Sequence, residues 1–137
     1  MAGGPQPAPV RSYAWADIPA HAPRAGVQQR GFRGAHVLVT QNLVQPGVSP
    51  NRHSHPFEQL ILVTQGTMRL HVGDQLLELG PNSIVRIPPG VEHWAEAPRE
   101  GEVPFINYDI FAPLREDYLH LVAYQPDFAG APARDGA

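Results

Sequence analysis

Short segments rich in β-branched and aromatic residues, each closed by glycine or proline, run through the middle of this chain. A Pro46-Gly47 turn follows the first segment, and Pro88-Pro89-Gly90 closes a later one. Such segments favour strands, while glycine and proline supply the backbone geometry of tight turns. The pattern predicts an all-β fold, an antiparallel sandwich or barrel. The expected strands cover residues 35–44, 58–64, 67–72, 75–79, 83–87, 91–97 and 103–111.

The length of the chain, 137 residues, fits one domain. We expect a flexible N-terminal tail over residues 1–14, a β-barrel over 15–125 and a flexible C-terminal tail over 126–137, because both ends are rich in small residues and proline. Only residues 114–121 resemble a helix, so we expect at most one short helical turn near the C-terminus. The sequence shows neither a signal peptide nor an apolar run long enough for a membrane span, which predicts a cytoplasmic protein without a membrane partner.

The residue inventory excludes several kinds of chemistry. The chain has no cysteine and no lysine, since all ten basic residues are arginine. Thiolate nucleophiles, disulfides, Schiff bases and phosphate-binding lysines are therefore excluded. The net charge of −3, with the arginines scattered, argues against nucleic acid as a partner. Seven histidines remain, and imidazole is the commonest metal ligand among side chains.

Four residues form a candidate metal site. His53 and His55 are two positions apart, which on a strand places both rings on one face, and Gln59 has the same parity. His93 follows the rigid Pro-Pro-Gly turn, on a separate strand. These residues predict a mononuclear site for a divalent metal ion, which could be Zn, Ni, Mn, Co or Fe.

The other histidines are weaker candidates. His71 alternates with apolar neighbours and is expected to face solvent, and His21 and His120 lie toward the ends of the chain. His36 begins a strand and could reach the metal site.

Two motifs resemble those of the cupin superfamily. Gly47 is followed after five residues by the pair His53-Ser54-His55, and Gly66 completes the first motif. The run PPGVEH, ending at His93, resembles the second motif, although Ala97 stands where cupins usually have asparagine. The resemblance implies a cupin-type double-stranded β-helix, a jelly-roll barrel, with a central metal held by His53, His55, Gln59 and His93. Glu58 competes with Gln59 as third ligand, but Glu58 has the wrong strand parity and falls one residue short of the family spacing.

The C-terminal segment carries a second resemblance. Asp109, Phe111 and Arg115 match positions that line the pocket of small cupins converting unsaturated uronates. The resemblance implies that Asp109 is a general acid or base, that Arg115 binds a carboxylate or enolate oxygen, and that Phe111 forms a wall. Zinc-dependent polyketide cyclases are related small cupins whose ring closures need the same activation of a carbonyl.

These residues lead to a functional hypothesis with two alternatives. A neutral ligand set leaves the full charge on the ion and favours Lewis-acid chemistry. We therefore expect a metal-dependent, non-oxidative enzyme, an isomerase, cyclase or lyase, acting on a small carbonyl compound. The alternatives are an Fe(II) dioxygenase that cleaves a C–C bond and a non-catalytic cupin that binds a small molecule.

A homodimer is also expected. Leu60 and Leu62 have the opposite parity to Gln59, and Trp94 the opposite parity to His93, which places apolar side chains outside the barrel.

Overall fold

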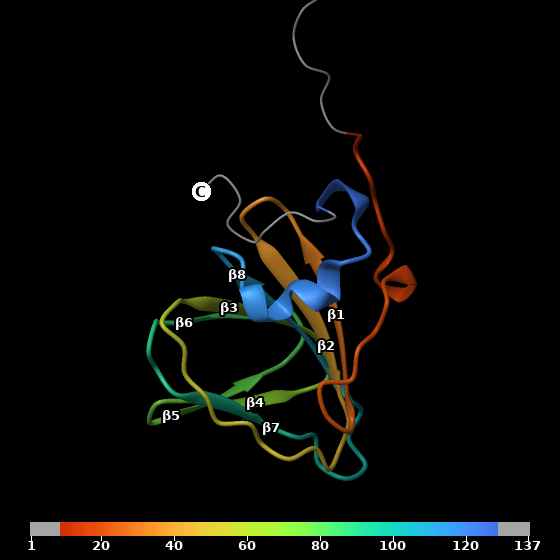
Figure 1. Cartoon of the computed structure of the whole chain (residues 1–137). Coiled ribbons are helices and arrows are strands. Elements are labelled where there is room, and N and C mark those ends of the chain that lie inside the picture. The colour runs from red at the N-terminus through yellow and green to blue at the C-terminus, as the bar shows by residue number, and fades with distance from the viewer. Residues whose placement is uncertain (1–8, 129–137) are drawn as a thin grey trace, which may run out of the picture.

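Eight strands form two antiparallel sheets in the computed structural model, which describes residues 9–128. The larger sheet has the order β1-β2-β8-β3-β6 and the smaller one β5-β4-β7. Figure 1 shows the smaller sheet lying across from β3 and β6, so that the two sheets enclose the interior. The strands are β1 (Val27–Arg33), β2 (Leu38–Val44), β3 (Gln59–Gln65), β4 (Met68–Val72), β5 (Gln75–Leu79), β6 (Ser83–Ile87), β7 (His93–Glu96) and β8 (Phe105–Phe111).

The all-β fold and the seven expected strands are confirmed, but the sequence did not reveal β1. Its buried positions are Val27, Gln29, Gly31 and Arg33, which show no apolar alternation. Gly31 is required by packing, because a Cβ atom there would lie only 2.8 Å from Cβ of Leu121. The glycine in β1 is explained only by the distant residue Leu121, so the strand cannot be recognised from its own residues.

Three short 3-10 helices accompany the strands in the part of the chain that the structure describes. They are η1 (Trp15–Asp17), η2 (Glu116–Val122) and η3 (Pro126–Phe128), and η2 lies over β1 in Figure 1. The helical turn expected near the C-terminus is therefore present as η2. No helix in residues 9–128 is long and apolar enough to cross a membrane.

The predicted tails fall partly outside the described residues, which exclude 1–8 and 129–137. Within the described part, the ring of Tyr13 packs edge-on against Phe32 and Tyr124, at centroid distances of 5.9 and 5.3 Å. The tail boundaries at residues 14 and 126 stay predictions.

The interior is built in layers that follow the strand register. At one level β1, β2 and β8 bring together Val27, Val44 and Phe105, which belong to the larger hydrophobic cluster. The next two levels are polar, and a second hydrophobic cluster lies beyond them. The polar levels contain Gln29, Asn42 and Asn107, then Thr40 and Asp109, and the second cluster contains Leu38, Phe111, Leu121 and Val122. A polar layer is thus enclosed between two apolar ones.

The outer face of the larger sheet carries apolar side chains. Leu60 and Leu62 point away from the interior, as their parity predicted, and both are half-buried. Ile84 on the neighbouring edge strand β6 is 63% exposed. The homodimer stays a prediction, and this apolar outer face is the surface through which we expect it to form.

The turn from β3 to β4 depends on Gly66, and this generates a first prediction. Gly66 has φ +73°, and a Cβ atom would lie 3.0 Å from both Pro104 O and Phe105 Cα. Gly66→Ala should lower the free energy of unfolding by about 1–3 kcal/mol, because backbone strain and a backbone clash add. Gly80→Ala is the control, since nothing lies within 4 Å of its Cβ position. Urea unfolding of the variants measures the difference, and equal losses would contradict the prediction.

Candidate metal centre

Backbone hydrogen bonds bring the two histidine segments together. His53 N donates to His93 O at 3.2 Å, and His93 N donates to His53 O at 2.9 Å. Gly90 N, in the Pro-Pro-Gly turn, donates to His55 O at 2.8 Å. His53 and His55 therefore lie in an extended segment before β3 that is joined to the partner segment by one bridge, and not in the regular strand assumed from their spacing.

The Nδ1 atom of each of the three histidines faces a backbone carbonyl oxygen. The partners are Asn51 O at 2.7 Å for His53, Phe57 O at 2.8 Å for His55 and Val91 O at 2.9 Å for His93. A carbonyl can only accept, so each Nδ1 carries a proton and donates it. In the neutral rings the lone pair is therefore on Nε2, the arrangement that a metal ligand needs.

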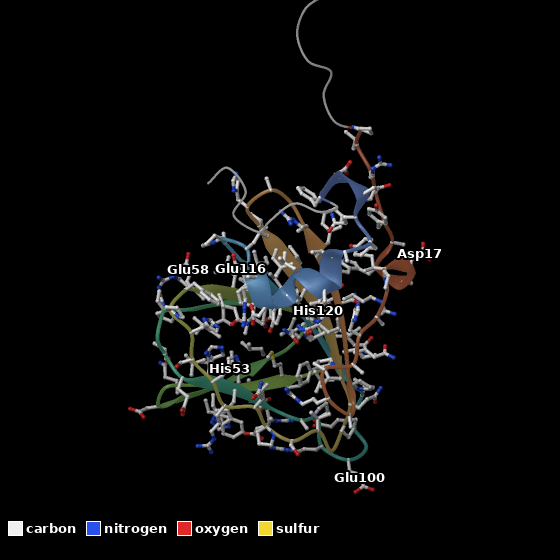
Figure 2. The ribbon with its side chains drawn as sticks, viewed as in Figure 1. Asp17, His53, Glu58, Glu100, Glu116 and His120 are labelled. Atoms are coloured by element: carbon white, nitrogen blue, oxygen red, sulfur yellow. The ribbon has the colours of Figure 1, made fainter. Side chains whose placement is uncertain are left out.

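The three rings converge between the sheets. One ring nitrogen of each histidine lies within 4.8 Å of the others, and Figure 2 shows His53 in the space between the sheets. Nε2 of His93 is buried without a hydrogen-bond partner. Burial lowers the pKa of His53 and of His93, against the effect of their backbone hydrogen bonds. Neutral rings with one unpartnered buried nitrogen are positioned to bind a metal ion.

Gln59 lies beside the histidines, whereas Glu58 does not. Gln59 is 5% exposed, and its Oε1 is 3.0 Å from Nε2 of His55. In the neutral ring, where Nδ1 of His55 holds the single proton, this contact joins two atoms that both carry lone pairs. Glu58 is on the outside, with a half-exposed side chain whose Oε2 accepts from Nε of Arg86 at 2.6 Å.

Asp109 orients Gln59 from the far side of its amide. Gln59 Nε2 and Asn107 Nδ2 donate to Oδ1 of Asp109 at 2.8 and 2.9 Å. Asn42 Nδ2 and Thr40 Oγ1 donate to Oδ2 at 2.9 and 3.4 Å. Burial raises the pKa of Asp109 to about 6, although the hydrogen bonds from Gln59, Asn42 and Thr40 oppose the rise. Because Gln59 Nε2 donates its hydrogen bond to Asp109, the amide oxygen of Gln59 points toward the histidines.

The polar partners of Asp109 were not identified from the sequence. Thr40, Asn42 and Asn107 occupy inward-facing positions of β2 and β8. Gln29 of β1 extends the network by donating to Asn42 Oδ1 at 3.0 Å. Polar residues at core parity are the signal that could have found them.

Arg115 and Phe111 adjoin the site in different ways. The Arg115 guanidinium lies 4.1 to 5.0 Å from the ring centroids of Phe57, Phe111 and Tyr118, and it makes two hydrogen bonds to Asp117. It also lines the cavity at the site. Phe111 is 2% exposed within the second hydrophobic cluster, behind the cavity lining, and its ring meets that of His55 edge-on at 6.0 Å. Phe111 is not among the residues that line the cavity, and its role as a wall stays a prediction.

The remaining histidines lie apart from this centre. His36 is exposed between β1 and β2 and does not line the cavity. His71 lies on the outer face of β4, as its parity predicts, with its side chain 26% exposed because it stacks on Trp94 and its Nε2 is 2.6 Å from Glu96 Oε2. His21 and His120 contact each other, with ring centroids 5.4 Å apart.

A cavity of about 210 Å³ opens at the histidines. This is below the roughly 300–1,000 Å³ of pockets for drug-sized ligands, so it suits a small molecule. Its exposed rim includes Arg24, Ser49, Asn51 and His53. Its buried lining combines the polar layer with part of the larger hydrophobic cluster.

The sequence matches the family model of the cupin domain over residues 42–110, half of the chain. The chain is a cupin. The match spans the segment from β2 to β8, including both histidine motifs and Asp109. No curated protein matches this sequence.

Solved structures share the fold of this cupin. An RmlC-like cupin from Shewanella frigidimarina is 21% identical, with a TM-score of 0.69 over 78% of this chain and 93% of that one. KdgF from Halomonas sp. is 19% identical, with a TM-score of 0.66 over 74% of this chain and 94% of that one. The polyketide cyclase RemF from Streptomyces resistomycificus is 22% identical, with a TM-score of 0.65 over 77% of this chain and 80% of that one.

The Asp109 network generates a second prediction. Asp109→Asn replaces an acceptor by a donor that faces other donors, so it should lower the free energy of unfolding by about 1–3 kcal/mol at pH 8. Glu58→Gln makes the same chemical change at an exposed position and should alter stability by less than about 0.5 kcal/mol. Urea unfolding measures both variants. A stability of Asp109→Asn equal to that of the unmodified protein would show that the network does not depend on the carboxylate.

Proposed function

We propose that this cupin is a metal-dependent, non-oxidative enzyme, an isomerase, cyclase or lyase, that acts on a small carbonyl compound. The metal ligands in this proposal are His53, His55, Gln59 and His93. The observation that carries it is the contact between His55 Nε2 and Gln59 Oε1 at 3.0 Å, next to the unpartnered Nε2 of His93. A shared cation turns these facing lone pairs from an unfavourable contact into a ligand set.

The choice of glutamine decides the type of chemistry. Three neutral imidazoles and an amide oxygen add no negative charge, so a bound divalent ion acts as a Lewis acid toward a carbonyl or a water. The protein's part is to hold these ligands: the backbone carbonyls fix the rings and Asp109 fixes the amide of Gln59. A preorganised set of this kind needs little rearrangement when substrate binds.

Asp109 and Arg115 are the proposed catalytic residues beside the metal. Both line the cavity, where Arg115 can bind an oxyanion through guanidinium nitrogens left free by Asp117. Asp109 already accepts four hydrogen bonds, and this supports a positioning role for it in addition to the predicted role as acid or base. The ring of Phe111 packs against the Arg115 guanidinium, with its centroid 4.9 Å from the guanidinium carbon.

The structural neighbours are consistent with this class of reaction. RemF is a polyketide cyclase, and cyclisation through a carbonyl is one of the reactions that the proposal includes. The cavity of about 210 Å³ favours a substrate smaller than a polyketide.

Metal analysis of histidine variants gives the third prediction. His93→Ala removes a ligand and should reduce the metal content of the purified protein to about a tenth or less. Loss of a residue that only orients a metal ligand already weakens metal affinity about 10–100-fold, so loss of the ligand itself should cost at least as much. His71→Ala, on the outer face, should keep the full content. Elemental analysis by mass spectrometry measures both, and circular dichroism checks the fold. Unchanged metal in His93→Ala would overturn the ligand assignment.

The matched pair at positions 58 and 59 gives the fourth prediction. Gln59→Ala should weaken metal binding about tenfold or more, whereas Glu58→Ala should leave it unchanged. A competition titration with a chromophoric chelator measures both affinities. The reverse order would make Glu58 the third ligand.

Oxygen uptake separates the non-oxidative proposal from the dioxygenase. The three histidines alone also suit Fe(II), so the protein is loaded with Fe(II) under nitrogen and then exposed to air together with a diketone or an aromatic diol. The proposal predicts no stoichiometric consumption of oxygen in an electrode assay. Stoichiometric uptake with a cleaved product would replace it by C–C bond cleavage.

A further inference from the structure

We propose that the cavity takes a small carboxylate with an apolar body, its carboxylate bound by Arg24, and that it discriminates against polyhydroxylated acids. Arg24 lies on the exposed rim, in the segment before β1, where no motif pointed to it. Because the substrate carbonyl is placed at the histidines, this ligand class rests on the proposed function.

Arg24 is the cation of the cavity that has no protein partner. Within residues 9–128, no hydrogen bond, ion pair or aromatic ring engages its guanidinium, whereas Arg115 is held by Asp117 and three rings. Both arginines are close enough to His53 to lower its pKa. Asp109 is the single carboxylate that lines the cavity among the described residues, and its oxygens are occupied. The rim therefore carries a positive charge that an anionic ligand can neutralise.

The inner part of the cavity is apolar. Its lining there includes members of the larger hydrophobic cluster from five strands: Val27, Val44, Ile61, Met68, Leu70 and Phe105, with Val48 beside them. None of these side chains can donate a hydrogen bond, and the thioether sulfur of Met68 is only a weak acceptor. An alkyl or aryl group would replace water against this surface with a gain in free energy.

The polar layer offers few groups to a hydroxyl. Gln29, Asn42, Asn107 and Gln59 already donate to one another or to Asp109. Among the described side-chain polar atoms that are closed off from solvent, His93 Nε2 is the one on a cavity-lining residue that has no partner, and it belongs to the metal centre. Each hydroxyl of a sugar acid held against the apolar part of the lining would lose its water without a replacement, which weakens binding by about tenfold or more.

Calorimetry with defined probes tests the ligand class. The probes are the 2-oxo acids from 2-oxobutanoate to 2-oxohexanoate, the methyl ester of 2-oxohexanoate, and galacturonate, each titrated into the purified full chain. We expect 2-oxohexanoate to bind most tightly and each methylene between 2-oxobutanoate and 2-oxohexanoate to add about fourfold. Arg24→Gln should weaken the acid about fivefold and leave the ester unchanged, while Arg24→Lys restores most of the affinity. Arg86→Gln, the same change on the outer face, should have no effect.

The outcomes separate this inference from the proposed function, because metal content is measured on the same samples. Galacturonate binding as tightly as 2-oxohexanoate, acid binding unaffected in Arg24→Gln, or metal-bearing protein that binds no acid would overturn the ligand class and leave the metal centre standing. Metal-free protein that still binds the acid through Arg24 would support the ligand class and overturn the proposed function.

Discussion

The reciprocal backbone hydrogen bonds between His53 and His93 are the contact on which the site depends. They join an irregular segment before β3 to the start of β7, forty residues later in the chain. Together with the hydrogen bond from Gly90 to His55, they fix the backbone positions of the three histidines. The carbonyls that accept from Nδ1 then fix how the rings turn. The main chain thus sets both the position and the tautomer of the three histidine rings.

The layered interior explains how a small barrel can contain this much polarity. Inward-facing positions change from apolar to polar and back along β2 and β8, and the polar levels coincide across strands because the register aligns them. Asp109 completes the network by accepting from four side chains, so a carboxyl group is buried with its hydrogen bonds made. One consequence is that the amide of Gln59 is held in one orientation, and another is that the amides of Gln29, Asn42 and Asn107 donate to Asp109 or to one another.

The sequence predicted what depends on local pattern. Alternation and turn residues revealed seven strands, and the motif spacing identified His53, His55, Gln59 and His93 as one group, which the structure brings together. It did not predict what depends on distant partners. Strand β1 has a glycine where Leu121 packs, and Asn42 and Asn107 gain their meaning only from Asp109 across the sheet. Arg24 carries no local signal, because its relation to the cavity comes from the way the segment before β1 folds over the rim.

Anomalous X-ray diffraction shows whether these four side chains hold one metal ion. Data from a crystal of the purified protein, collected on both sides of the absorption edge of the metal found by elemental analysis, locate the ion. We expect one peak between the sheets, at about 2.0–2.3 Å from Nε2 of His53, His55 and His93 and from Oε1 of Gln59. A peak bound through Nδ1, a peak coordinated by Glu58, or no peak among the histidines would contradict this expectation.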